Sequence, residues 1–279
     1  MKNKINIDEH NKIINMYNSG MSIQKIADKY LVSSSVIRNI LIKYNVETRD
    51  NSHKGRKYTL DENYFDRVDS YNKAYILGLL YADGCNYTKS NHVFIELQER
   101  DKKILEDINK ELGSDRPLLY NDLHSKNENW QSTYRLSFVN KHMSSVLSEL
   151  GLVANKSLIL EFPQWLDESL YPHFLRGYMD GDGHLEIESK NKFLTCVGTK
   201  MFCESIKDIC KKILDIDVSI HNISSKKDSV TKIIYICGKT KIKMFLDYIY
   251  NDAELYIERK YKSYKSFCEF YNTNNSLSA

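Results

Sequence analysis

Two short segments of this chain resemble one another and lie far apart in the sequence. The first, AYILGLLYADGC, occupies residues 74–85, and the second, HFLRGYMDGDGH, occupies residues 173–184. Each begins in apolar residues, carries small residues four positions apart and runs into an Asp-Gly pair. Small residues at that spacing share one helix face and allow two helices to approach closely. The chain is therefore expected to fold into two related halves that meet at a helix pair.

The expected helix contact brings two acidic side chains together. The small residues that would form it are Gly78, Ala82, Gly177 and Gly181. The two helices would then end side by side, one at Asp83 and the other at Asp182. The glycine after each acid, Gly84 or Gly183, is expected to adopt the left-handed conformation that commonly ends a helix.

Two carboxylates at neighbouring helix ends are unfavourable alone, because each faces a like charge and the negative end of a helix dipole. A divalent cation reverses that balance, and Mg²⁺ prefers carboxylates, carbonyl oxygens and water as ligands. Such cations can activate water and stabilise the leaving oxygen in phosphodiester cleavage. We therefore predict a site for Mg²⁺, or another divalent cation such as Mn²⁺, at Asp83, Asp182, Gly84 and Gly183. The simpler alternative is that both acids are solvated or capping residues in turns.

The two segments resemble the two motifs of the LAGLIDADG homing endonucleases, with one copy at 76–84 and the other at 175–183. The likeness extends over about residues 71–270, since residues 134–151 also resemble residues 233–250. It implies an α+β fold of two pseudo-symmetric repeats, each helix, two strands, helix, two strands and helix. These repeats, at about 71–160 and 170–272 within a domain at 71–279, would form a saddle of antiparallel sheets.

One motif copy departs from the family pattern. Tyr81 stands where the second copy has Asp180, the earlier acid of the motif. Because that position varies in the family, we expect Asp180 to be structural. Arg176 is unusual in a motif helix and is expected to lie off the contact between the helices.

The resemblance also implies an activity: a monomeric, site-specific endonuclease that cuts both strands of a long, unsymmetrical DNA target. Asp83 and Asp182 would hold the catalytic metal. Lys141 and Lys239, which correspond at matching strand ends, are predicted to assist catalysis, with Lys156 and Lys260 as alternatives that contact phosphate or brace the fold. Two other functions remain open, an RNA maturase acting on intron RNA and a DNA-binding regulator that does not cleave.

Alternating apolar and polar residues predict strands at 92–98 and 133–138, and more weakly at 184–188. One face of each strand would be buried, and the other would be free to contact DNA. In the family the sheets lie over the major groove. Candidate contacts on that face are Gln98, Gln131, Thr133, Arg135 and His184. The alternative is an ordinary solvated sheet face.

Residues 1–48 show the order of a helix-turn-helix domain: a helix, a short helix, a tight turn and a helix. The last helix would enter the major groove through Ser34, Ser35, Arg38 and Asn39. A basic linker is expected at 49–70, with Arg56 and Lys57 along phosphates. A three-helix packing unit that binds no nucleic acid is the alternative.

Charge and composition narrow the choice of partner and location. The whole chain carries a net charge of +3, but its first sixty residues hold eleven basic and five acidic side chains, a net of +6. That segregation favours a polyanionic partner. The longest apolar run, residues 74–82, is far too short to cross a bilayer, and no secretory signal is visible. We therefore expect an intracellular, cytoplasmic protein without a membrane partner, encoded by a bacterium or phage, with an organelle as the alternative location.

Overall fold

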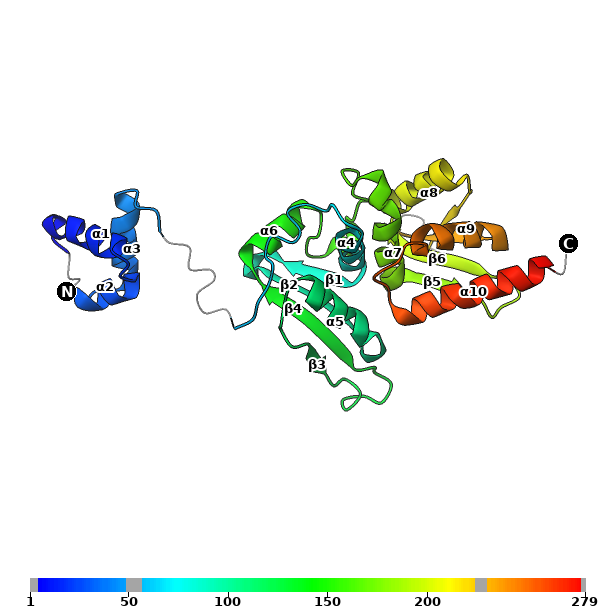
Figure 1. Ribbon diagram of the computed structural model, residues 1–279, viewed down its shortest axis with the longest axis horizontal. Helices are drawn as coiled ribbons and strands as arrows, with labels where there is room; N and C mark the ends of the chain where they lie inside the picture. Colours follow the sequence, from blue (N-terminus) through cyan, green and yellow to red (C-terminus); the bar gives the residue numbers. More distant parts are fainter. Residues whose placement is uncertain (1–4, 49–56, 224–229, 277–279) are drawn as a thin grey trace. The chain divides into compact units, whose positions relative to one another are not determined.

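The computed structural model describes residues 5–48, 57–223 and 230–276 of the chain (Figure 1). The chain divides into two compact units, Met1–Lys57 and Tyr58–Ala279. The first unit is helical, and the second contains both copies of the repeated segment. Among the helices described, none is both long and apolar enough to cross a membrane.

The expected linker at 49–70 falls partly outside the described residues and partly inside the larger unit. Residues 49–56, which include Arg56, are not described. Residues 58–70 pack on the first repeat, where Tyr64 and Phe65 are buried in the main hydrophobic core. Because this stretch is mostly polar, the sequence did not indicate that these two aromatic residues are buried.

The N-terminal unit contains α1 (His10–Asn18), α2 (Ile23–Lys29) and α3 (Ser34–Lys43). Their apolar side chains form one core, which consists of Ile13, Tyr17, Ile26, Ala27, Ile37, Ile40 and Leu41. Ser22 caps α2 by accepting a hydrogen bond from the backbone N–H of Lys25 at 3.2 Å. Leu31, with a φ of 52°, tightens the turn between α2 and α3. The expected order of helix, short helix, turn and helix is therefore present.

The larger unit repeats one arrangement of helices and strands. The first repeat consists of α4 (Tyr71–Asp83), β1 (Gly84–Tyr87), β2 (His92–Gln98), α5 (Lys102–Glu111), β3 (Leu119–Asn121), β4 (Thr133–Val139) and α6 (Lys141–Glu149). The second consists of α7 (Tyr171–Asp182), β5 (Gly183–Glu186), β6 (Phe193–Thr199), α8 (Lys200–Leu214), β7 (Ser219–Asn222), β8 (Thr231–Cys237) and α9 (Lys239–Tyr250). The order expected for each half is confirmed. A further helix, α10 (Glu258–Ser276), follows and was not predicted.

Each repeat contributes one antiparallel four-stranded sheet, and the two sheets flank the α4–α7 pair (Figure 1). The strand order is β1-β2-β4-β3 in one sheet and β5-β6-β8-β7 in the other. In β2, Val93, Ile95 and Leu97 are buried, whereas the residues between them stay partly accessible. One face of the sheet thus packs on helices and the other carries accessible side chains. The expected α+β fold is confirmed.

The alternation predicted at residues 184–188 continues beyond the strand. β5 ends at Glu186, whose carboxylate accepts hydrogen bonds from the backbone N–H groups of Glu188 at 2.8 Å and Ser189 at 2.9 Å. These bonds turn the chain away from the sheet.

The strand register shows how closely the two repeats correspond. Gly84, the first residue of β1, pairs with Ile95, which in turn pairs with Leu136. The equivalent row of the second sheet contains Gly183, Cys196 and Ile234. Every position of β1, β2 and β4 therefore has a defined counterpart in β5, β6 and β8.

The helices α4 and α7 touch through their backbones. A Cβ atom placed on Gly78 would lie 2.0 Å from the carbonyl oxygen of Phe174, and one on Gly177 would lie 2.0 Å from that of Tyr75. A Cβ on Gly181 would lie 2.4 Å from the Cβ of Ala82. The four small residues selected from the sequence all lie in this contact.

Buried polar groups join the second motif helix to its surroundings. The Asp180 carboxylate accepts hydrogen bonds from Tyr75 Oη at 2.8 Å, Ile257 N at 2.7 Å and Tyr250 Oη. Arg176 is fully buried, with its guanidinium 5.1 Å from the centre of the Tyr75 ring. Its guanidinium donates to the carbonyl oxygens of Ile249 and Leu255, both at 2.9 Å, so Arg176 lies beside the helix contact and is bonded to α9 and the segment after it. The satisfied hydrogen bonds of Asp180 give it a structural role.

Gly177→Ala is expected to destabilise the larger unit by about 1–3 kcal/mol, because the added methyl group forces the two backbones apart. Thermal unfolding of the purified protein measures the effect. Lys207→Ala, at an exposed position of α8, is the control and should stay within about 0.5 kcal/mol of the parent. An unchanged melting temperature for Gly177→Ala would contradict the close contact.

Candidate functional site

The helices α4 and α7 end next to each other, and each ends in an acid. A Cβ atom placed on Gly181 would lie 2.7 Å from Oδ2 of Asp83, so this carboxylate lies against the last turn of α7. Asp182 follows Gly181 directly in that turn. The two carboxylates predicted to meet therefore lie at one junction between the repeats.

The glycines that follow the acids are extended rather than left-handed. Gly84 has a φ of −79° and Gly183 a φ of −82°, so the prediction of a left-handed helix end is wrong. The reason is that a strand starts at once, without a loop. Glycine is still required, because a Cβ would lie 2.6 Å from the Leu80 carbonyl oxygen at Gly84 and 2.4 Å from the Met179 carbonyl oxygen at Gly183.

A lysine lies at the same place in each repeat. Lys156 Nζ donates a hydrogen bond to the carbonyl oxygen of Gly84, and Lys260 Nζ donates to that of Gly183. Lys156 comes from the segment after α6, and Lys260 from the first turn of α10. Each ammonium is thus held one residue beyond a helix-terminal acid.

The charges at this junction influence one another. Both carboxylates reach solvent, yet the surrounding protein removes much of their hydration. That desolvation, together with the charge of Asp182, raises the pKa of Asp83 to about 6. Desolvation also raises the pKa of Asp182, while the positive charge of Lys156 opposes the rise. Desolvation lowers the pKa of Lys156 and of Lys260. The positive charges of the lysines lower the pKa of each acid by less than desolvation raises it.

An ion pair fixes the start of α10 on the opposite repeat. Arg259 Nη2 lies 2.9 Å from Oδ2 of Asp101, whose side chain is only 4% exposed. Asp101 precedes α5 in the first repeat, whereas Arg259 adjoins Lys260 in the second. Sequence reasoning missed this pair, because residues 158 positions apart carry no local signal of their contact.

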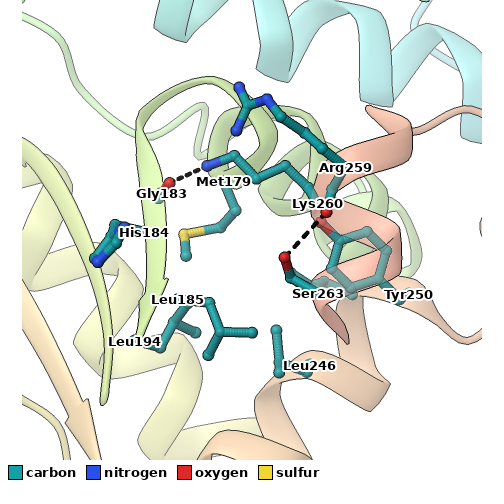
Figure 2. A pocket seen from close by; sticks show the side chains of 11 residues that line it. Met179, Gly183, His184, Leu185, Leu194, Leu246, Tyr250, Arg259, Lys260 and Ser263 are labelled. Carbon is teal, nitrogen blue, oxygen red and sulfur yellow. Dashed lines mark hydrogen bonds between the residues drawn. The ribbon is translucent and has the colours of Figure 1, made fainter. Parts of the chain in front are cut away.

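A pocket of about 240 Å³ adjoins the junction in the second repeat (Figure 2). Lys260 extends from α10 to the carbonyl oxygen of Gly183 along one side of it. Leu185, Leu194 and Leu246 line the opposite part, and Met179 lies between them and Lys260. The lysine stem is therefore held against apolar surface while its ammonium reaches the junction.

Lys141 and Lys239 do not lie at the acids. Leu136 is in the same row as Gly84, and Lys141 follows it by five residues at the far end of β4. Lys239 follows Ile234 by the same interval. Each strand continues for three residues past that row, roughly 10 Å, and each lysine then begins the next helix, α6 or α9. Lys141 and Lys239 thus lie away from the acids, whereas the alternatives, Lys156 and Lys260, adjoin them. A part in catalysis stays a prediction for either pair.

The donor groups at the junction fit a divalent cation. Mg²⁺ typically uses one or two carboxylates together with water and substrate phosphates, rather than a cage of protein ligands. In the described ranges, no three His, Cys, Asp or Glu side chains cluster to form such a cage. Asp83 and Asp182 supply the carboxylates. The carbonyl oxygens of Gly84 and Gly183 already accept lysine hydrogen bonds but keep a second lone pair.

The polar candidates on the sheets differ in their surroundings. Glu96 accepts hydrogen bonds from both Thr133 and Arg135, so these two are held together. Gln98 Oε1 is buried without a partner in the part of the chain that is described. Gln131 is exposed and precedes β4, whereas His184 is exposed on β5, 3.9 Å from Glu186.

In the N-terminal unit, Ser35, Arg38 and Asn39 are exposed on α3, and Lys57 is exposed at the end of the unit. Ser34 is less accessible, and its hydroxyl donates to Oε1 of Gln24 on α2 at 2.6 Å. Ser34 therefore braces the two helices, while the other α3 candidates share an open helix face.

Comparison with known proteins agrees with the repeat and the fold. Residues 170–250 match the model of the LAGLIDADG-like domain. The I-LtrWI LAGLIDADG homing endonuclease, solved bound to target DNA, is 13% identical over 77% of this chain and 92% of its own, with a TM-score of 0.50. The LAGLIDADG meganuclease I-AabMI, bound to uncleaved DNA, is 14% identical over 73% and 91%, with a TM-score of 0.48. No curated protein matches the sequence significantly.

The larger unit therefore has the LAGLIDADG homing endonuclease fold, with a LAGLIDADG-like domain as its second repeat.

Asp83→Asn is expected to stabilise the metal-free protein at pH 7. A carboxyl whose pKa is raised to about 6 destabilises the fold when ionised, and this cost appears as the pH rises from about 4 through 6. Because the group reaches solvent, the gain should be about 1 kcal/mol, or 2–4 °C in melting temperature.

Below about pH 4 the difference between parent and variant should vanish, since the aspartate is then protonated. Asp208→Asn, at an exposed position of α8, serves as the control and should not change the melting temperature. Destabilisation by Asp83→Asn at pH 7 without metal would show that the ionised carboxylate does not carry the desolvation and like-charge cost that raises its pKa.

Proposed function

We propose that this chain is a site-specific endonuclease that cuts both strands of double-stranded DNA. The observation that carries the proposal is the junction of α4 and α7, where each repeat supplies one acid and one lysine. A site with two equivalent halves suits a duplex, because its two strands present two scissile phosphates related by approximate symmetry. Asp83 would serve one strand and Asp182 the other.

The sheets and the N-terminal unit support DNA as the substrate. The accessible faces of the two sheets differ in sequence, so they would read two different half-sites of a long, unsymmetrical target. The first sixty residues carry a net charge of +6, which favours a polyanion. The exposed side chains of α3, Arg38 and Asn39, would extend the contact into a neighbouring major groove. The single chain contains both repeats, so a monomer suffices.

Each group at the junction has a specific task. When bound, Mg²⁺ or Mn²⁺ would supply Lewis-acid stabilisation of the charge that develops in phosphodiester hydrolysis. Asp83 and Asp182 would hold it, and both must be ionised to do so. Lys156 and Lys260 would place positive charge beside the scissile phosphates, where it stabilises the transition state more than the ground state. Nothing in the described residues favours the alternatives, an intron RNA maturase or a regulator that does not cleave.

Asp83→Asn and Asp182→Asn should each abolish double-strand cleavage. Sites cut by the parent protein with Mg²⁺ are first isolated from a randomised duplex library and then used as substrates. We expect each variant to retain binding to these sites but to cleave them at least about 1000-fold more slowly, since a lost metal ligand removes several kcal/mol of transition-state stabilisation. Asp208→Asn should cleave normally. Full cleavage by either junction variant, or none by the parent, would refute the proposal.

Lys156→Met and Lys260→Met should each slow cleavage by about 100- to 1000-fold, because each removes a charge at a developing anion. Met keeps most of the apolar stem, which limits effects on packing. Lys141→Met is the matched control and should leave the rate unchanged, since Lys141 begins α6, beyond the end of β4 that lies away from the acids. Rates are measured at saturating protein. The opposite pattern, a slow Lys141 variant and normal Lys156 and Lys260 variants, would contradict the geometric assignment.

A further inference from the structure

The two sheets differ most sharply at one pair of equivalent positions. In the first sheet, Glu96 on β2 pairs with Arg135 on β4, one step beyond the row of Gly84. The same step beyond the row of Gly183 holds Val197 on β6 and Ile233 on β8. An ion pair in one repeat thus corresponds to an apolar pair in the other.

Arg135 is held in one orientation. Its Nε donates to Oε2 of Glu96 at 2.8 Å, and its Nη2 donates to the same oxygen. The other oxygen of Glu96 accepts from Thr133 and from Asn121, the latter at 3.3 Å. The Arg135 guanidinium also lies 4.6 Å from the centre of the Phe94 ring. Glu96 is therefore a positioning residue, fixed from two sides, that fixes Arg135 in turn.

This arrangement leaves a specific edge of Arg135 available. Glu96 occupies the side of the guanidinium formed by Nε and Nη2, and the end formed by Nη1 and the second Nη2 hydrogen remains. The Arg135 side chain is 37% exposed. Two parallel N–H donors at the end of an arginine match O6 and N7 of guanine, which makes this the commonest specific contact in the major groove.

The second sheet presents a different chemistry at the same place. Val197 and Ile233 are partly accessible, and their neighbours on the same face include Thr195 and Tyr235. Aliphatic side chains cannot read a donor or acceptor pattern, but they can contact the C5-methyl group of thymine. Burial of one methyl group against such a surface favours binding by about fourfold.

We propose that the two repeats recognise chemically different half-sites: Arg135 selects guanine in one half, and Val197 with Ile233 selects thymine in the other. The inference rests on the proposed endonuclease function, and it adds which bases each sheet prefers. Because the two positions are equivalent, the guanine and the thymine should lie at corresponding distances from the centre of the target, one in each half.

The first test is selection of bound duplexes from a randomised library by the full chain, with Ca²⁺ in place of Mg²⁺. The parent should enrich a target with one guanine position in one half and a thymine position at the matching place in the other. Arg135→Gln should lower the preference for guanine at its position by about 10- to 100-fold, leaving the other half unchanged. Thermal unfolding of each variant verifies that it is folded.

The second test removes the methyl group alone. Deoxyuridine in place of the selected thymine keeps every hydrogen-bonding group, so affinity should fall about fourfold for the parent and by less for Ile233→Ala, which keeps only the Val197 contact. The double variant Val197→Glu, Ile233→Arg transfers the ion pair to the second sheet and should convert its thymine preference to guanine.

The base preferences of the two sheets can be absent while the endonuclease activity is present. A selected target whose guanine preference survives Arg135→Gln, or whose thymine tolerates deoxyuridine without loss, would overturn this inference while the endonuclease proposal stands. Failure to enrich any sequence, together with absence of cleavage, would overturn both.

Discussion

The backbone contact between α4 and α7 is the constraint on which the rest of the larger unit depends. Gly78 and Gly177 leave no room for a side chain, since a Cβ at either would lie 2.0 Å from a carbonyl oxygen of the opposite helix. Because the helices pack this closely, their last residues meet, and two desolvated carboxylates share one junction. The same contact places a sheet on either side (Figure 1). The close helix contact thus brings two carboxylates together, which raises the electrostatic free energy of the folded protein. A bound cation would lower it again.

Much of the fold could be predicted because it is repeated and periodic. Two motif copies, each with small residues four apart, predict the helix contact, and alternating residues predict β2 and β4. The details that escaped prediction depend on contacts between distant residues. The ion pair of Arg259 with Asp101 joins the repeats, and buried Arg176 donates to the carbonyl oxygens of Ile249 and Leu255, more than seventy residues away. Neither partner carries a local pattern that identifies the other.

In the candidate site, the acids could be predicted from the sequence, but the lysines that adjoin them could not. The acids follow from the motif, because helix geometry fixes where a helix-terminal side chain lies. The positions of the lysines do not follow from the sequence. A correspondence between the repeats shows that two residues are equivalent, but it does not show where in the structure they lie. Lys141 and Lys239 are equivalent and far from the acids along the strands, whereas Lys156 and Lys260 are equivalent and adjoin them. Only strand register and tertiary contacts separate the two pairs.

The proposed endonuclease requires that Asp83 and Asp182 form one divalent-cation site where the two repeats meet. The most direct measurement is anomalous diffraction from crystals of the protein with its selected DNA and Mn²⁺. Anomalous peaks should lie in coordination contact with both carboxylates, beside the two scissile phosphates. Peaks confined to other residues, with both carboxylates free of metal, would contradict the proposed site.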